Sequence, residues 1–163
     1  MSHRSLGAAV HRWWLAPILI GLALAAVAGC QPRPAETGGL LAEVRALLTR
    51  SAAAWNAGDL DGFVSDYSVD SLTAFVSGGR PQYGYDWIRN HYAPTFAVGA
   101  QRDSLRFETI TARSLGTAHA LATARFVLFR RDSVTASGPF TLVLTRTDGR
   151  WLIIHDHTSS DPQ

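Results

Sequence analysis

The sequence predicts an α+β fold, because its first half carries helical patterns and its second half carries strand patterns. In residues 40–57 apolar side chains recur every three or four positions, which is typical of an amphipathic helix. From residue 104 onward the chain is rich in Val, Ile, Thr, Phe and Leu, with short polar breaks. Residues 40–159, about 120 in all, are enough for one domain with a hydrophobic core.

The first helix is predicted to end at a sharp corner, encoded by Trp-Asn-Ala-Gly-Asp at residues 55–59. Gly58 is the expected stop, because glycine readily adopts the left-handed conformation that follows many helices. Asp59 can cap the N-terminus of a second helix over residues 60–67. These two residues therefore predict two helices that meet at a tight turn.

A short strand, a turn and a third helix are expected next. The strand covers residues 71–76, and the turn covers Ser-Gly-Gly-Arg-Pro at residues 77–81. The third helix is predicted over residues 86–93. We expect it to end or kink at Pro94, because proline cannot donate the backbone hydrogen bond to residue 90.

The second half predicts an antiparallel meander, with strands over residues 105–113, 118–130, 134–146 and 151–158. Asp148-Gly149, between two apolar runs, is the strongest hairpin signal in the chain. Both alternating faces of the second strand are partly apolar, so both sides of the sheet should be covered. The helices can cover one side, and a second copy of the chain is a natural cover for the other. This pattern predicts a homodimer.

The N-terminal segment is typical of an export signal. Arg4 and Arg12 precede an apolar stretch over residues 15–28, and small residues lead directly to Cys30, the only cysteine. The ending Val-Ala-Gly-Cys resembles a bacterial lipobox, whose cysteine is lipidated and becomes the new first residue. Residues 1–29 are therefore predicted to be a lipoprotein signal peptide. A plain secretory signal or an uncleaved anchor is the alternative.

This prediction sets the expected organisation and location of the chain. Residues 30–39 would be a flexible tether, residues 40–159 the domain and residues 160–163 a tail. The protein would be exported and anchored to a membrane by the lipid on Cys30. The expected location is the periplasmic side of the outer membrane or the cell surface.

Composition excludes several classes of function. The chain carries 15 basic and 13 acidic residues, and Arg4 and Arg12 lie within the predicted signal. The charge-balanced remainder offers no basic surface for nucleic acid. The chain has no lysine, which excludes Schiff-base chemistry and a Walker-type phosphate lysine. Because Cys30 would carry the lipid, no thiol is left for catalysis, and no cofactor is expected.

Local motifs add a family resemblance. The corner at residues 55–59, Asp66-Tyr67, a glycine four residues before Ile88 and the closing segment 148–159 resemble the SnoaL-like, DUF4440-type branch of the nuclear transport factor 2 (NTF2)-like superfamily. The resemblance implies a cone-shaped fold in which a curved antiparallel sheet wraps three helices around a pocket. Members often dimerise through the sheet. The superfamily includes ketosteroid isomerase, scytalone dehydratase, polyketide cyclases and a kinase association domain, so the fold alone does not define a function.

The closing segment contains the most conspicuous polar group, His155-Asp156-His157. Simple strand alternation would place both histidines on one face with Trp151 and Ile153, and Asp156 on the other. Three interpretations remain open: a structural role, a pocket wall that binds a polar ligand group, and catalysis or metal binding. A catalytic zinc site typically needs a third protein ligand, and no spacing in the sequence supplies one, so no metal is expected.

Other candidate ligand-binding residues are aromatic or basic. The third helix and its approach bring several aromatic residues and one histidine, which could stack on a flat ligand or fill the core. Arginine inside a pocket would bind a carboxylate with two hydrogen bonds, whereas on a strand it usually reaches the edge. The candidate ligand-binding residues are Trp55, Tyr67, Tyr83, Trp87, His91, Arg125 and Trp151.

Enzymatic function requires an acid in the right place. Ketosteroid isomerase-like chemistry needs a carboxylate base and an acidic donor in a dry pocket. Asp66, Asp70 and Asp86 lie where capping explains them, and no acid is expected to face the histidines. We therefore expect a domain that binds a small, partly apolar ligand without turnover. The alternative is an isomerase, dehydratase or cyclase that uses His155 or His157 as general base.

Overall fold

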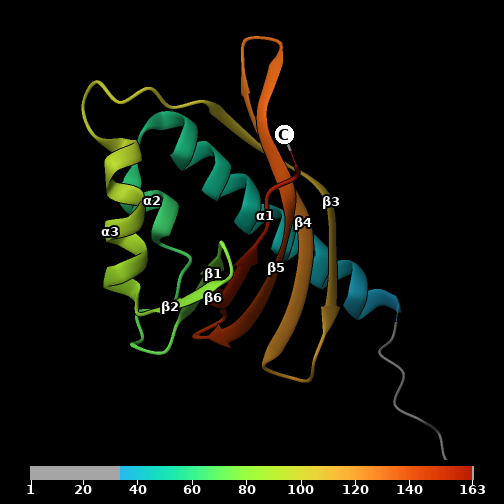
Figure 1. The fold of residues 1–163 in the computed structure, drawn as a ribbon. Coiled ribbons are helices and arrows are strands. Elements are labelled where there is room, and N and C mark those ends of the chain that lie inside the picture. The colour runs from blue at the N-terminus through green and yellow to red at the C-terminus, as the bar shows by residue number, and fades with distance from the viewer. Residues whose placement is uncertain (1–33, 163) are drawn as a thin grey trace, which may run out of the picture. The chain divides into compact units, whose positions relative to one another are not determined.

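The computed structural model describes residues 34–162, and the predicted signal peptide and Cys30 lie outside them. The described part is an α+β domain, as the sequence predicts (Figure 1). The helices are α1 (Pro34–Ala57), α2 (Leu60–Val64) and α3 (Tyr85–Phe96). The strands are β1 (Ala74–Ser77), β2 (Arg80–Tyr83), β3 (Ser104–Ser114), β4 (His119–Arg130), β5 (Ser133–Thr147) and β6 (Arg150–Thr158).

The strands form one curved, unclosed sheet in the order β2-β1-β6-β5-β4-β3. Neighbours are antiparallel except β1 and β6, which are parallel. The three helices lie on the concave side, as Figure 1 shows. The hydrophobic core contains the buried side chains of α1, including Val44 and Leu47. It also contains the inward-facing alanines of β4, Ala120 and Ala122. This arrangement is the cone that the resemblance implies.

The helix–helix corner forms as predicted. Gly58 has a φ of 79°, and the Asp59 carboxylate accepts a hydrogen bond from the Gly62 amide at 2.9 Å. α1 begins at Pro34 rather than at Leu40, so part of the segment predicted as a tether is helical. Proline suits the first position of a helix, because its φ is already helical and its missing N–H is not needed there.

The predicted hairpin at Asp148-Gly149 is also present. Asp148 and Gly149 have φ values of 50° and 77°, as a two-residue turn with the twist of a β-hairpin requires. Gly78 and Gly79 make a second tight turn, but the predicted turn over residues 77–81 is too long. Arg80 and Pro81 already belong to β2, which pairs with β1. Proline is tolerated in β2 because this is an edge strand.

Of the two outcomes expected at Pro94, an end of the helix there is wrong. The helix runs on to Phe96, with Pro94 inside its last turn. Proline there removes the hydrogen bond to the carbonyl of Asn90, and Asn90 is exposed, so water can replace that bond. The extra turn brings Phe96 against Trp55, with ring centroids 5.3 Å apart.

Candidate functional site

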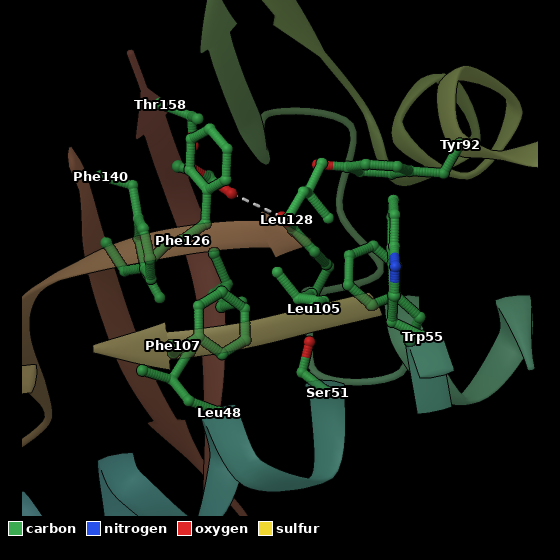
Figure 2. A pocket seen from close by; sticks show the side chains of 15 residues that line it. Leu48, Ser51, Trp55, Tyr92, Leu105, Phe107, Phe126, Leu128, Phe140 and Thr158 are labelled. Atoms are coloured by element: carbon green, nitrogen blue, oxygen red, sulfur yellow. Dashed lines mark hydrogen bonds between the residues drawn. The ribbon is translucent and has the colours of Figure 1, made fainter. Parts of the chain in front are cut away.

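A cavity of about 180 Å³ lies between the helices and the concave face of the sheet (Figure 2). Its walls are mostly apolar: Leu48, Trp55, Phe63, Leu105, Phe107, Phe126, Leu128, Phe140, Leu142 and Ile153. Five polar residues join them: Ser51, Tyr67, Tyr92, Asp156 and Thr158. On the inner face of β4, Ala120, Ala122 and Ala124 are buried in the core, and Phe126 and Leu128 further along the same face line the cavity.

The aromatic walls are held rigidly. Figure 2 shows Trp55 and Tyr92 on one side of the cavity and Phe126 and Phe140 on the other. The Trp55 indole donates a hydrogen bond to the carbonyl of Asp103 at 2.8 Å. Its ring packs edge-on against Phe63, with centroids 5.1 Å apart. Edge-to-face packing of this kind fixes ring orientation as well as burying area.

Asp156 is the one carboxyl group of the cavity lining. Its side chain accepts a hydrogen bond from the Tyr67 hydroxyl at 2.6 Å on Oδ2 and from the Thr158 hydroxyl at 2.8 Å on Oδ1. Only 6% of Asp156 is exposed, and none of the ion pairs among residues 34–162 involves it. Burial raises the pKa of Asp156, although the hydrogen bonds from Tyr67 and Thr158 act in the opposite direction.

The two tyrosines are permanent hydrogen-bond donors. Burial raises the pKa of Tyr67 and of Tyr92 well above the ordinary value of 10.0, and the negative charge of Asp156 adds to both shifts. Each hydroxyl therefore keeps its proton throughout the physiological pH range. The cavity thus combines an apolar body with one cluster of hydroxyls around a single carboxyl.

A β-bulge explains why Asp156 faces the cavity. Leu144 pairs with Ile153 but Val143 pairs with His155, so Ile154 is an extra residue in β6. Alternation restarts after the bulge, and Ile153 and Asp156 both face inward. The prediction that Ile153 shares a face with His155 and His157 is therefore wrong.

The histidines and the tryptophan of β6 lie away from the cavity lining. His155 is half-buried and His157 is exposed, on the opposite side of the strand from Asp156. Trp151 donates a hydrogen bond to Glu43 and stacks with Arg146, whose guanidinium lies 5.4 Å from the ring centroid. These contacts place Trp151 at the rim of the sheet beside α1.

The remaining predicted residues divide into two groups. Trp55 and Tyr67 line the cavity. Within residues 34–162, the cavity lining contains no histidine and no arginine. His91 stacks on Trp87 with centroids 4.9 Å apart, outside the lining.

Two further candidates face solvent. Arg125 binds Asp161 and Ser137 on the outer face, and Tyr83 is 57% exposed. The structure therefore brings together Trp55 and Tyr67 from the predicted set.

The sequence-based prediction missed Asp156 as a cavity residue, together with Ser51, Tyr92 and Thr158 as polar lining. Asp156 and Thr158 are two residues apart on β6, and this spacing indicates that they share a face. The bulge that turns this face inward cannot be recognised from the amino-acid composition of β6. Within residues 34–162 no cluster of three or more His, Cys, Asp or Glu side chains could hold a metal ion. In the same part of the chain, no helix combines the length and apolar character needed to cross a bilayer.

Comparisons with known proteins agree with this architecture. An NTF2-like protein of unknown function from Shewanella oneidensis shares 28% identity at a TM-score of 0.63, covering 72% of this chain and 97% of its own. A protein of unknown function from Mycobacterium tuberculosis has 18% identity and a TM-score of 0.64, covering 80% and 78%.

A protein from Nostoc punctiforme with a cystatin-like fold has 14% identity and a TM-score of 0.63, covering 75% of this chain and 91% of its own. The search of curated proteins found no match. The SnoaL-like domain family matches residues 44–162, which span α1 to the end of β6 and include every residue of the cavity. The chain therefore belongs to the SnoaL-like domain family, within the NTF2-like superfamily.

Proposed function

We propose that this domain binds a small, largely apolar molecule in its cavity without turnover. The supporting observation is a cavity of about 180 Å³ with rigid aromatic and leucine walls and one polar end. Apolar cavities of about 150 Å³ stay dry and bind benzene. The ligand is therefore of the size of one six-membered ring with a short substituent.

The weak acidity of the other titratable groups in the lining favours binding over catalysis, because burial raises the pKa of both Tyr67 and Tyr92. Acid–base catalysis at carbon needs a base and an acidic donor that both reach the substrate. In the cavity lining, Asp156 is the one carboxyl, and the Tyr67 proton is engaged with it at 2.6 Å. Ser51 and Thr158 are too weakly acidic to replace a second acid.

An isomerase or dehydratase remains the second candidate, because Asp156 is a buried carboxyl with a raised pKa. In this version Asp156 would be the general base and Tyr92 the donor. The geometry favours Asp156 over His155 or His157 as base, since neither histidine is part of the lining. Turnover of a ring ketone or ring alcohol by the purified chain, lost in Asp156→Asn, would favour this candidate.

Binding is tested by filling the cavity. Leu128→Phe adds a ring to the inner face of β4, and Leu121→Phe adds the same ring to the outer face of the same strand. We expect ligand-observed NMR to detect toluene and benzyl alcohol on the unaltered chain and on Leu121→Phe, but not on Leu128→Phe. Equal binding by all three proteins would contradict the proposal.

We also propose that two copies associate through the outer face of the sheet. Leu121 and Val143 are cross-strand partners there, and both are only half-buried in a single copy. Native mass spectrometry should give twice the mass of one chain. A monomer at micromolar concentration would contradict this proposal.

The lipid anchor on Cys30, and with it the location at a membrane surface, is a further proposal that depends on the sequence pattern. Mass spectrometry of the N-terminal peptide from a bacterial host tests it. The expected peptide begins at Cys30 and carries acyl chains, and an unmodified Cys30 would contradict it.

A further inference from the structure

We propose that the ligand of this cavity is a primary amine on a single-ring body, bound as an ammonium ion by Asp156. This inference deepens the proposed function and depends on it. The amine inference specifies the charge of the ligand, whereas the proposed function specifies only its size and its largely apolar character.

Asp156 is a buried acid that forms no ion pair with another residue between 34 and 162. Tyr67 and Thr158 each occupy one of its oxygens. A carboxylate offers about four acceptor sites, so each oxygen can accept another hydrogen bond. A buried carboxylate without a counter-charge is costly, and either a proton or a cation must compensate it.

No arginine or histidine of the described residues lines the cavity, so a cation could enter it. Besides Asp156, the ionisable groups that line the cavity are Tyr67, from the segment after α2, and Tyr92, from α3. His155 and His157 flank Asp156 along β6 on the other face of the strand, and their charge lowers the pKa of Asp156, but neither histidine is part of the cavity lining. The described lining therefore holds no positive charge that would exclude an ammonium ion.

The aromatic walls of the cavity also suit a cation. An ammonium ion is attracted to the face of an aromatic ring within about 6 Å of its centroid. Trp55, Phe63 and Tyr92 form a cluster on one side of the cavity, with Phe63 and Tyr92 centroids 4.9 Å apart. A carboxylate surrounded by hydroxyls and aromatic rings suits a primary ammonium, which donates up to three hydrogen bonds.

Four probes of similar size separate the alternatives: benzylamine, benzyl alcohol, benzoate and toluene, each titrated calorimetrically into the full chain at pH 7. We expect benzylamine to bind about tenfold or more tightly than benzyl alcohol, because hydrogen bonds between ions are the strong ones. Benzoate should not bind, since its charge repels Asp156. If benzylamine binds no more tightly than benzyl alcohol, the amine inference is wrong, but the proposed function is still supported. Failure of all four probes overturns both.

The role of Asp156 is tested by Asp156→Asn, with Asp66→Asn as the matched control outside the cavity. Asp156→Asn should lower benzylamine affinity about tenfold and leave benzyl alcohol nearly unchanged. For the unaltered chain, benzylamine affinity should rise with pH while the amine stays protonated, because the raised pKa of Asp156 makes a proton compete with the ammonium. Affinity that is independent of both Asp156 and pH overturns the inference. If Asp156→Asn fails to fold, the affinities of the four probes and the pH dependence of benzylamine binding, both measured on the unaltered chain, still test the inference.

Discussion

Two buried aspartates in this domain have opposite surroundings. Asp66, 2% exposed, is bound by two arginines, with Arg50 at 3.1 Å and Arg150 at 3.4 Å. Asp156, 6% exposed, is bound by the hydroxyls of Tyr67 and Thr158 and borders a cavity. Asp66 is neutralised by the chain itself, whereas Asp156 is not.

This difference separates an acid with a structural role from the acid of the proposed ligand site. Asp66 also fixes the backbone, because its carbonyl accepts the amide hydrogen of Ile153 at 2.7 Å. It therefore ties the segment after α2 to β6. Asp156 lies just beyond the bulge in the same strand and borders the cavity in which we propose that a ligand binds. The two aspartates are similarly buried, and they differ in their partners, which are arginines for Asp66 and hydroxyls for Asp156.

The largest expected effect comes from deleting Val143, which lies on β5 opposite the bulge. Its neighbours Leu142 and Leu144 are 2% and 0% exposed, and the deletion forces one of them off the inner face. We expect a loss of about 3 kcal/mol or more in the free energy of unfolding, measured by urea denaturation. Deletion of Ile154, the extra residue of the bulge, is the control and should cost less, because simple alternation then keeps Asp156 on the inner face. Equal costs would show that Ile154 is not an extra residue in the pairing of β6 with β5.

The next prediction compares the stabilities of the two aspartate variants directly. Asp66→Asn should lower the free energy of unfolding by about 2 kcal/mol, because a buried acceptor loses its charge-assisted bonds to two arginines. Asp156→Asn should change it by less than about 1 kcal/mol, since the lost bonds are offset by the lost cost of burying a charge. Urea denaturation at pH 7 measures both. A cost for Asp156→Asn equal to that for Asp66→Asn would mean that Asp156 is also structural.

A smaller effect is expected from Tyr67→Phe, which removes the donor nearest to Asp156. The free energy of unfolding should fall by about 1 kcal/mol at pH 7, as for a typical hydrogen bond to a buried group. Tyr83→Phe, at an exposed tyrosine, should have no measurable effect. Indistinguishable urea midpoints for the two variants would argue against the Tyr67–Asp156 bond.

The smallest effect is a pH dependence that Asp156 should contribute. Its pKa is raised on folding, so between the ordinary value of 3.8 and the folded value the native state binds more protons than the unfolded state. Its contribution is therefore fully present below 3.8 and is lost as pH rises through the folded pKa. The unaltered chain should gain stability relative to Asp156→Asn as pH falls from 7 toward 4.5, measured by urea midpoints. A relative loss would reverse the assigned sign.

Elements with local signals were predictable from the sequence. Gly58 and Asp59 encode the corner, and Asp148-Gly149 encodes the last hairpin, because each residue acts through its own backbone preference. The motifs at residues 55–59 and 148–159 also led to the family and its cone-shaped fold.

The orientation of Asp156 was not predictable in the same way. Ile154 is an ordinary strand residue, and its position as a bulge depends on the pairing with Val143 and Leu144 on β5. Simple alternation through Ile154 groups Ile153 with His155 and His157 and places Asp156 on the opposite face, whereas the bulge puts Ile153 and Asp156 on the same face. For the same reason, Ser51 and Tyr92 could not be distinguished from core or surface residues before the helices were placed on the sheet.

The most direct test is a ¹³C NMR titration of the Asp156 side-chain carboxyl, without and with saturating benzylamine. We predict a midpoint above 3.8 in the empty cavity, because burial outweighs the two hydrogen bonds. With benzylamine bound, the midpoint should be lower, because an ammonium ion stabilises the carboxylate. A midpoint at or below 3.8 without ligand, or one that benzylamine leaves unchanged, would contradict the central claim that Asp156 is an uncompensated acid at the ligand site.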